Sequence, residues 1–345
     1  MPQVVRFDAP YRVSVAEVPQ ERLGRGDVRV RTLYSGISAG TELTAYRGTN
    51  PYLVSAWDPE LRLFTDPPDV APGYPLEGWG YSEVGEVVEV SAIDGPSPQV
   101  GDVVWGIWGH RSEACLNGAV AKRQTLPAGV PGEVGTFARV GSVALNAVLA
   151  AQCGIGSTVV VLGQGVIGLL ATAFAVRSGC RVIAVDRIEA RRLQALRYGA
   201  EQALGPDEEV AGRVRALTGG RGADAVIELS GSYAALHEGT RIAGPDAHVV
   251  AAGFYQGPAD ALRLGQEFHH NRVSIVSSQI GAVASHLQPR WSRERLTDAV
   301  MAELAGPGPR VLELVRHRFP VDGVAEAFEL LDQRPAEALQ VLLEF

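Results

Sequence analysis

From about residue 125 the chain alternates short runs of Val, Ile and Ala with helical segments such as EARRLQALRYG. The apolar runs are STVVVL, RVIAVD, a short EQALG, ADAVIEL, AHVVAAG and RVSIVSS. This alternation predicts a parallel, doubly wound sheet with helices on both faces. Continuous apolar strands suit a sheet that is covered on both sides. The fold class is therefore α/β.

A glycine fingerprint follows the first of these strands directly and opens a helix. Its members are Gly163, Gly165, Val166, Ile167 and Gly168. The first glycine allows a tight turn, the second lets the backbone approach a pyrophosphate, and the third lets the helix pack closely on the strand. A helix N-terminus also stabilises negative charge. Together with six strands, the pattern predicts a dinucleotide site; the alternative is a purely structural turn.

Asp186 ends the next strand, 18 residues after Gly168. An acid there accepts hydrogen bonds from the adenosine 2′-hydroxyl and repels a 2′-phosphate, which favours NAD over NADP. Arg187 directly after it tempers that preference. The alternative role for Asp186 is to cap the following helix.

The first 120 residues show a different, β-rich pattern. VVRF, YRVSVAEV and DVRVRTL alternate apolar with polar residues, and EVGEVVEV and GDVVWGIWG resume the pattern. Six prolines between Asn50 and Tyr81 exclude a regular helix or central strand and indicate a surface excursion near a site. Two C-terminal segments are expected to return to the first domain. They are the helix RERLTDAVMAELAG and the strand, helix and strand of HRFPVDGVAEAFELLDQRPAEALQVLLEF. The expected domains are 1–124 with 283–345, and 125–282.

Charge and composition exclude several classes of protein. The 31 basic and 39 acidic residues give a net charge of −8, with no run of five like charges, so neither nucleic acid nor an anionic membrane is an expected partner. Residues 140–176 carry no charge and are long enough to cross a bilayer, but the glycine fingerprint inside them indicates strand, turn and helix.

The cysteines and the N-terminus favour a cytoplasmic protein. Cys115, Cys153 and Cys180 are far apart and form no CxxC, which argues against a disulfide framework and against a cysteine-built zinc lobe. The N-terminus MPQVVRFDAPYRVSV carries charges and a proline where a signal peptide needs an apolar stretch, so no export signal is expected.

Several motifs occur in the order typical of one superfamily: GISAGTELTAYRG, GYSEVGEVVEV, GDVVWG, the glycine fingerprint and HRFPVDGVAEAFELL. Over nearly its whole length the chain resembles the medium-chain dehydrogenase/reductase superfamily, the zinc alcohol dehydrogenase-like fold. The resemblance implies a GroES-like catalytic domain, a central Rossmann NAD-binding domain and a homodimer formed through the last Rossmann strand. It also implies nicotinamide-side contacts at successive strand ends: Ser230, Gly231, Gly253, Phe254, Ser277 and Ser278.

The chain departs from its zinc-containing relatives at the metal. Where they have Cys before Gly-Thr-Asp, this chain has Ser38 and Ala39 before Gly-Thr-Glu, and where they have Gly-His-Glu it has Tyr81 in place of the histidine. The third ligand position falls near Arg139. Tyrosine and arginine are not usual zinc ligands, so we expect no zinc. The variants resemble the zinc-lacking branch that includes bacteriochlorophyllide a dehydrogenase.

Without a metal, a protein acid or base must handle the hydroxyl proton. Tyr81 is the first candidate, and its ordinary pKa of about 10 would have to be lowered, by the nicotinamide or by Arg139; the alternative is a packing role. Thr41 lies at the relay hydroxyl position and is expected to contact substrate. Glu42 and His110 are further acid–base candidates, with the alternatives of a structural partner and a surface residue.

The remaining candidates concern substrate contact and overall activity. Ser38 and Arg139 are expected beside the substrate, and Trp105 and Trp108 could line an apolar wall or, for one of them, pack in the core. The predicted activity is zinc-independent, NAD-dependent interconversion of a secondary alcohol and a ketone on a small molecule that is sugar-like, a cyclitol or a secondary metabolite. The alternatives are an NADPH-dependent quinone or enoyl reductase, a non-catalytic nucleotide-binding protein, and a redox-neutral enzyme with tightly held NAD.

Overall fold

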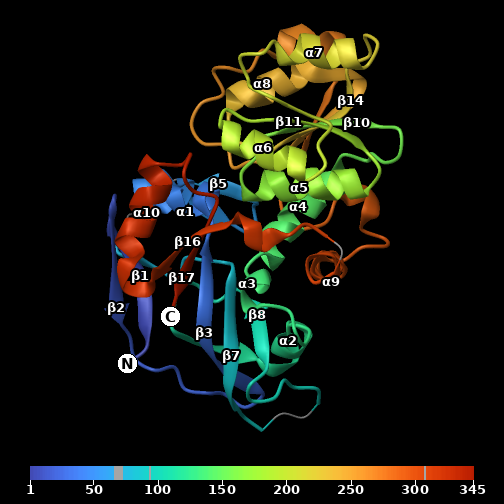
Figure 1. Ribbon diagram of the computed structural model, residues 1–345. Helices are drawn as coiled ribbons and strands as arrows, with labels where there is room; N and C mark the ends of the chain where they lie inside the picture. The colour runs from blue at the N-terminus through green and yellow to red at the C-terminus, as the bar shows by residue number, and fades with distance from the viewer. Residues whose placement is uncertain (66–72, 93–94, 307) are drawn as a thin grey trace. The chain divides into compact units, whose positions relative to one another are not determined.

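The computed structural model describes residues 1–65, 73–92, 95–306 and 308–345. These residues form two compact units: unit 1 comprises Met1–Arg139 and Val311–Phe345, and unit 2 comprises Val140–Arg310. Unit 1 therefore contains both ends of the chain, and unit 2 is inserted between its two segments (Figure 1).

Unit 2 is built on a parallel six-stranded sheet in the order β12-β11-β10-β13-β14-β15. The chain builds one half outward from β10, then crosses over to β13 and builds the other half. The strand order thus reverses between β10 and β13, which is where ligands bind in such sheets. The strands are β10 (Thr158–Leu162), β11 (Arg181–Val185), β12 (Gln202–Leu204), β13 (Ala223–Glu228), β14 (Ala243–Ala251) and β15 (Ser274–Ser277). The doubly wound prediction is confirmed.

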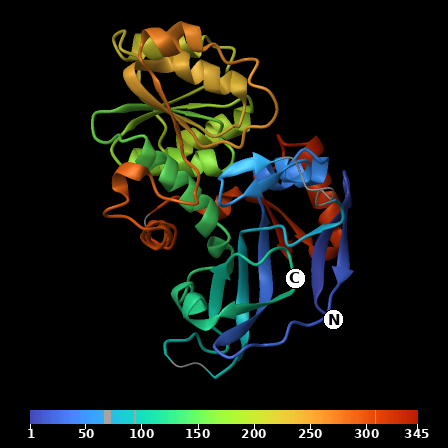
Figure 2. The same ribbon diagram turned by 180° about the vertical axis from the view of Figure 1, so that it is seen from behind.

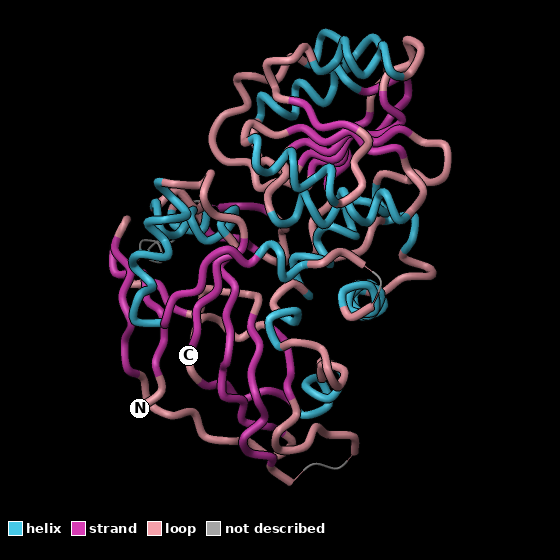
Figure 3. Tube along the Cα trace, viewed as in Figure 1, coloured by secondary structure: helices cyan, strands magenta, loops and turns pink. Residues whose placement is uncertain are grey.

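Helices cover both faces of this sheet. Figure 1 shows α7 and α8 on one face and α5 and α6 on the other, and Figure 3 shows the sheet between them. The charge-free residues 140–176 form most of α4, then β10 and most of α5, and no helix of the described residues is long and apolar enough to cross a membrane. The helices are α4 (Ala138–Ala150), α5 (Val166–Arg177), α6 (Glu189–Arg197), α7 (Val210–Leu217), α8 (Tyr233–Ile242) and α9 (Arg293–Leu304).

Unit 1 is β-rich, as the alternating sequence predicts. Its main sheet has the order β16-β17-β3-β7-β8, with β9 paired to β3, and a smaller sheet has the order β2-β1-β6 (Figure 2). The main sheet consists of β3 (Asp27–Ile37), β7 (Glu83–Val90), β8 (Val103–Gly106), β9 (Glu113–Asn117), β16 (Val315–Pro320) and β17 (Gln340–Glu344). The smaller one consists of β1 (Gln3–Ala9), β2 (Arg12–Glu17) and β6 (Leu76–Glu77), and the helices are α1 (Ala39–Arg47), α2 (Gly118–Arg123), α3 (Gly132–Gly135) and α10 (Val324–Gln333).

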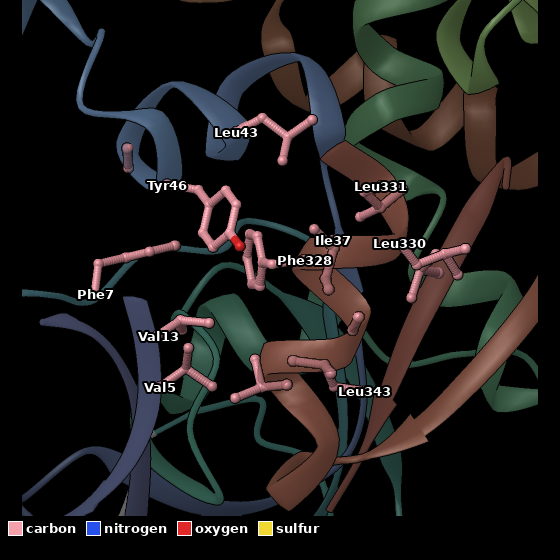
Figure 4. Packing of buried hydrophobic residues seen from close by; sticks show 14 of the residues in the cluster. Val5, Phe7, Val13, Ile37, Leu43, Tyr46, Phe328, Leu330, Leu331 and Leu343 are labelled. Carbon is pink, nitrogen blue, oxygen red and sulfur yellow. The ribbon is translucent and has the colours of Figure 1, made fainter. Parts of the chain in front are cut away.

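An aromatic core joins the two chain segments of unit 1. Phe328 of α10 is fully buried, stacks on Tyr46 of α1 with 5.5 Å between ring centroids, and meets the edge of Phe7 at 5.1 Å. Figure 4 shows these rings packed together with Val5, Val13 and Leu343. Since α1 also carries Thr41 and Glu42, this core holds a site-bearing helix against the rest of unit 1.

The boundaries between the units fall later in the chain than the sequence suggests, at 139/140 and 310/311 instead of 124/125 and 282/283. Residues 125–139 stay with unit 1 because α3 packs on the sheet: a Cβ on Gly135 would lie 2.7 Å from Val84. Helix α9 stays with unit 2 because it packs on α4, with Val300 against Gly141. The expectation that this helix returns to the first domain is therefore wrong, whereas β16, α10 and β17 do return to it.

The proline-rich excursion lies partly outside the described residues, because 66–72 are not among them. The described part contains a short hairpin of β4 (Ala56–Asp58) and β5 (Leu63–Thr65). The rings of Trp57 and Phe64 contact each other on it and are both exposed. The described part is thus neither regular helix nor central strand.

Candidate functional site

The glycine loop of unit 2 needs glycine for different reasons at its three positions. Gly163 has a φ of +87°, and a Cβ there would lie 2.8 Å from the Ser230 nitrogen. A Cβ on Gly168 would lie only 1.8 Å from the Gly163 carbonyl oxygen, so α5 approaches the turn as closely as its backbone allows. Gly165 differs, because its φ of −70° suits any residue and open space surrounds the place of a Cβ. Packing within the described residues therefore does not account for glycine at position 165.

The loop is tied down by a residue that the sequence did not single out. Gln164 is fully buried; its Nε2 donates to the Val161 carbonyl at 3.0 Å, and its Oε1 accepts from the Thr172 hydroxyl at 2.9 Å. Val166 and Ile167 then start α5, whose N-terminus has no side-chain cap. Uncapped N–H groups at a helix start suit an anion such as a pyrophosphate.

Asp186 lies beside this loop at the end of β11. Its two carboxylate oxygens accept from the backbone nitrogens of Gln164 at 2.6 Å and Ile188 at 2.8 Å. The second bond shapes the turn into α6, although the N-cap residue of that helix is Ile188. Arg187 is exposed, while Arg192 donates to the carbonyl oxygens of both Asp186 and Arg187. The carboxylate is thus fixed beside the glycine loop, where a ribose-binding acid is expected.

A buried acid, Glu228, organises the neighbouring strand ends and was not predicted as a site residue. Its carboxylate accepts from the Ser230 nitrogen at 2.7 Å, the Gly231 nitrogen at 3.1 Å, and the hydroxyls of Ser230 and Tyr255. Burial raises the pKa of Glu228, and the bonds from Ser230 and Tyr255 oppose that rise. An acid that ends an apolar strand, ADAVIEL, was the available signal. Glu228 holds together the loops after β13 and β14.

The other predicted contacts lie at the same edge of the unit 2 sheet. Gly253 packs against Gly231, where a Cβ would lie 2.4 Å from the nitrogen, and Phe254 is 41% exposed. Ser277 is exposed, and Ser278 is buried and accepts a bond from Asn146 at 3.3 Å. The carboxyl ends of β13, β14 and β15 thus carry these residues, as the strand pattern predicts.

In unit 1 three hydroxyl groups meet. Ser38 and Thr41, at the start of α1, both reach Tyr81, which lies two residues before the start of β7: the Ser38 hydroxyl is hydrogen-bonded to the phenol, and the Thr41 hydroxyl lies 3.3 Å from it. Burial raises the pKa of Tyr81, and the bonds to Ser38 and Thr41 and the charge of Arg139 oppose the rise without cancelling it. Of the two groups expected to lower the pKa of Tyr81, Arg139 acts in that direction but does not outweigh burial.

Glu42 and His110 lie behind this hydroxyl cluster. His110 Nε2 is 2.5 Å from Glu42 Oε2, both side chains are fully buried, and Glu42 Oε1 accepts from the Ser38 backbone nitrogen at 2.8 Å. The alternative of a surface histidine is wrong, because the imidazole is enclosed by α1, β3 and β7. Within the described residues, the hydrogen bond from Glu42 to this cluster is the one that it accepts from the Ser38 backbone nitrogen.

Two further buried residues complete the surroundings of His110 and were not predicted. Ser35 Oγ is 2.6 Å from His110 Nδ1 and donates to Glu83 Oε1 at 3.1 Å, while Glu83 Oε2 accepts from the Trp108 nitrogen at 2.9 Å. Burial raises the pKa of Glu83, against the opposing charge of His110. A serine and an acid inside strand-like sequence were the only signals.

The two tryptophans have different environments. Trp108 packs in the core with Val30 and Val104, and its indole nitrogen donates to Thr32 at 2.9 Å, so the expectation that it lines a substrate wall is corrected. Trp105, one residue beyond Val104 on β8, points to the opposite face and is half-buried.

The residues at the family's metal positions do not fit a zinc ion. Positions 38, 81 and 139 offer a hydroxyl, a phenol and a guanidinium, and a guanidinium has no lone pair to give. Within the described ranges, no group of three or more His, Cys, Asp or Glu side chains is placed to hold a metal.

The family model and the relatives that this chain is similar to are all described as dehydrogenases. A family model described as zinc-binding dehydrogenase matches residues 166–295, a segment that excludes positions 38, 81 and 139. The chain is 29% identical to D-guloside 3-dehydrogenase of Escherichia coli over 345 residues, covering 98% of each chain. It is 26% identical to L-threonine 3-dehydrogenase of Pyrococcus abyssi over 365 residues, covering 96% of this chain and 95% of the relative.

Solved structures agree on the fold. The short chain alcohol dehydrogenase of Escherichia coli CFT073, in complex with NADH, matches with a TM-score of 0.75 at 22% identity and covers 100% of this chain and 99% of its own. A zinc-binding dehydrogenase-type protein of Sinorhizobium meliloti bound to NADP matches with a TM-score of 0.76 at 20% identity and covers the same shares.

The glycine loop generates a stability prediction. Gly168→Ala should lower the midpoint of urea unfolding, because its methyl group would collide with the Gly163 carbonyl oxygen. The expected loss in the free energy of unfolding is about 1–3 kcal/mol. Gly165→Ala and the helix variant Gly212→Ala, both with open space, should leave the midpoint unchanged or raise it. Circular dichroism measures the three midpoints. Equal midpoints for all three variants would show that α5 does not pack on the turn as described.

Proposed function

We propose that this chain interconverts a secondary alcohol and a ketone with NAD and without zinc. The proposal builds on its membership of the medium-chain dehydrogenase/reductase superfamily, in which it is an alcohol dehydrogenase-like oxidoreductase. The two relatives are named as dehydrogenases acting at position 3 of a guloside and of threonine. Both positions are secondary alcohols. The guloside relative supports a sugar-like substrate.

The observation that supports the proposal is the contact of the Ser38 and Thr41 hydroxyls with the Tyr81 phenol. When bound, a nicotinamide cofactor accepts the hydride from the alcohol carbon or supplies it to the ketone carbon. The protein must then take up or supply one proton at the substrate oxygen. The Tyr81 phenol supplies that proton in ketone reduction, and the phenolate accepts it in alcohol oxidation. Thr41 and Ser38 orient the phenol through their hydroxyls.

NAD is the proposed cofactor because of the fixed carboxylate of Asp186. The residues present fit the cofactor: Gly165 leaves room for the pyrophosphate, the uncapped start of α5 faces it, and Asp186 stands beside the loop. The carboxylate cannot turn away from a 2′-phosphate without giving up two backbone bonds. Arg187, the next residue, is exposed, and its positive charge tempers that preference for NAD.

The acid–base role of Tyr81 is tested by Tyr81→Phe. Turnover should fall on the order of 10²-fold, the usual size of general acid–base catalysis, while NADH affinity stays the same because the glycine loop is untouched. Tyr34→Phe, another half-buried tyrosine of unit 1, is the control and should retain full turnover. Unchanged turnover in Tyr81→Phe, with a panel of secondary alcohols and ketones, would reduce Tyr81 to a packing residue.

The raised pKa of Tyr81 gives the direction of the pH dependence. Because the phenol stays protonated to above its ordinary value of about 10, ketone reduction should be nearly flat between pH 6 and 9, and alcohol oxidation should rise with pH over the same range. Steady-state rates in both directions measure this. An oxidation rate that does not rise would assign the proton to another group.

Cofactor preference is tested by titrating the protein with NADH and NADPH. The wild type should bind NADH more tightly, and Asp186→Ala should narrow the difference by removing the repelling charge. Glu189→Ala, an exposed acid in the first turn of α6, should leave the preference intact. Equal or tighter binding of NADPH by the wild type would favour the quinone or enoyl reductase alternative, and binding of NADH with no turnover would favour a non-catalytic protein.

Zinc independence is tested by elemental analysis of the purified protein together with chelator treatment. The donors at positions 38, 81 and 139 should hold no stoichiometric zinc, and activity should survive the chelator. Stoichiometric zinc, with activity lost on chelation and restored by the metal, would overturn the proposal.

A further inference from the structure

Four buried polar side chains form a closed network behind the hydroxyl cluster. Ser35 of β3, Glu42 of α1 and Glu83 of β7 are 0% exposed, and His110, which follows β8, is 1% exposed. Three of the four can carry charge. Burial of unpaired charge is strongly unfavourable, so their hydrogen bonds must satisfy one another.

The hydrogen bonds determine the protonation of His110. Ser35 has one hydroxyl hydrogen but contacts both Glu83 Oε1 and His110 Nδ1. With Glu83 as a carboxylate, which can only accept, Ser35 donates to Glu83 and accepts from His110 Nδ1. On the other side Nε2 lies 2.5 Å from Glu42 Oε2, and the other oxygen of Glu42 accepts from the Ser38 backbone nitrogen. In this arrangement both ring nitrogens are donors, as in an imidazolium.

The electrostatics agree with this accounting. Burial by itself would lower the pKa of His110, but the carboxylates of Glu42 and Glu83 outweigh burial, and the pKa is raised. These two acids, from α1 and β7, are the titratable groups whose charges act on the imidazole.

The network touches the candidate catalytic residues at two points. Glu42 fixes the backbone nitrogen of Ser38. Gly80, the residue before Tyr81, lies so close that a Cβ would be 2.7 Å from Glu83 Oε1 and 2.9 Å from His110 Nδ1. Its φ of +112° and this close approach both require glycine. The backbone on each side of the Ser38–Tyr81 hydrogen bond therefore rests on the same buried network.

We propose that His110, held as an imidazolium between Glu42 and Glu83, is a positioning residue that sets the geometry of the Ser38–Tyr81 pair. It contacts neither substrate nor cofactor and acts by fixing Ser38 through Glu42 and by packing against Gly80. Its effect on turnover rests on the proposed role of Tyr81, whereas its charge state does not.

The charge state is measured on the wild-type protein by nitrogen NMR with ¹⁵N-labelled histidine. The signal pair that disappears in His110→Gln should show protons on both ring nitrogens at pH 8 and should not titrate between pH 5 and 8. A neutral ring at pH 8, with one nitrogen bare, would overturn the inference whatever the fate of the proposed function. This measurement remains decisive if a variant folds poorly, because His110 can then be assigned from its contacts to Glu42.

The positioning role is measured by a double-mutant cycle. His110→Gln should lower kcat by about 10- to 100-fold, the size expected for a misplaced catalytic group, with no change in NADH affinity. In a Tyr81→Phe background the same substitution should cost little more, since it acts through Tyr81. Glu86→Gln, which removes an acid from the same strand β7 where it pairs with Arg31, is the control and should retain full kcat.

The outcomes separate the two proposals. An equal loss from His110→Gln in both backgrounds would mean that His110 supports unit 1 generally and does not position Tyr81. If Tyr81→Phe itself has full turnover, the proposed acid–base role fails and the positioning role fails with it, while the NMR result still decides whether His110 is an imidazolium.

Discussion

The arrangement of unit 1 depends on the hydrogen bonds that the Glu42 carboxylate makes. One oxygen accepts from the backbone of Ser38, and the other is bonded to His110, so a single side chain joins the start of α1 to the segment after β8. A carboxylate with no exposure to water must find such donors inside the protein. Helix α1 cannot shift along the sheet without breaking a charge-assisted bond in a low-dielectric interior, where it is strongest.

Unit 2 uses the same device at Glu228. This buried acid also sits beside a loop that the proposed reaction needs and also draws backbone N–H groups to itself, from Ser230 and Gly231. The partners differ in one respect. Glu42 is bonded to a cation, whereas Glu228 is surrounded by neutral donors, including Tyr255. In both units a buried acid thus fixes backbone N–H groups.

The sequence predicted what depends on periodicity and missed what depends on burial. The six parallel strands of unit 2, the glycine turn and the position of Asp186 at a strand end follow from local patterns, because parallel strands and fingerprint glycines have spacings that do not vary much. Helix α1 was not predicted: it has nine residues, and Ser38 at its N-cap makes no side-chain cap. Glu83 lies on β7 and His110 in the loop between β8 and β9, Ser35 of β3 links the two, and no local spacing encodes those contacts. The raised pKa of Tyr81 was missed for the same reason, since burial outweighs the nearby hydroxyls and Arg139.

A phenol in the place of a metal ligand, as proposed for Tyr81, would change which step the protein must assist. A zinc ion stabilises an alkoxide directly, as a fixed positive charge. Here burial first, and then the charge of Glu42, raise the pKa of the phenol, so the site disfavours a negative charge on Tyr81. Such a site is suited to giving a proton to an oxygen as hydride arrives, and oxidation then requires the proton to leave before or with the hydride. The hydroxyls of Ser38 and Thr41 are placed to stabilise the brief phenolate, and Arg139 contributes the opposing positive charge. The chemistry proposed for this chain thus follows from the balance between the burial of the phenol and the two hydroxyls and one guanidinium that oppose its effect.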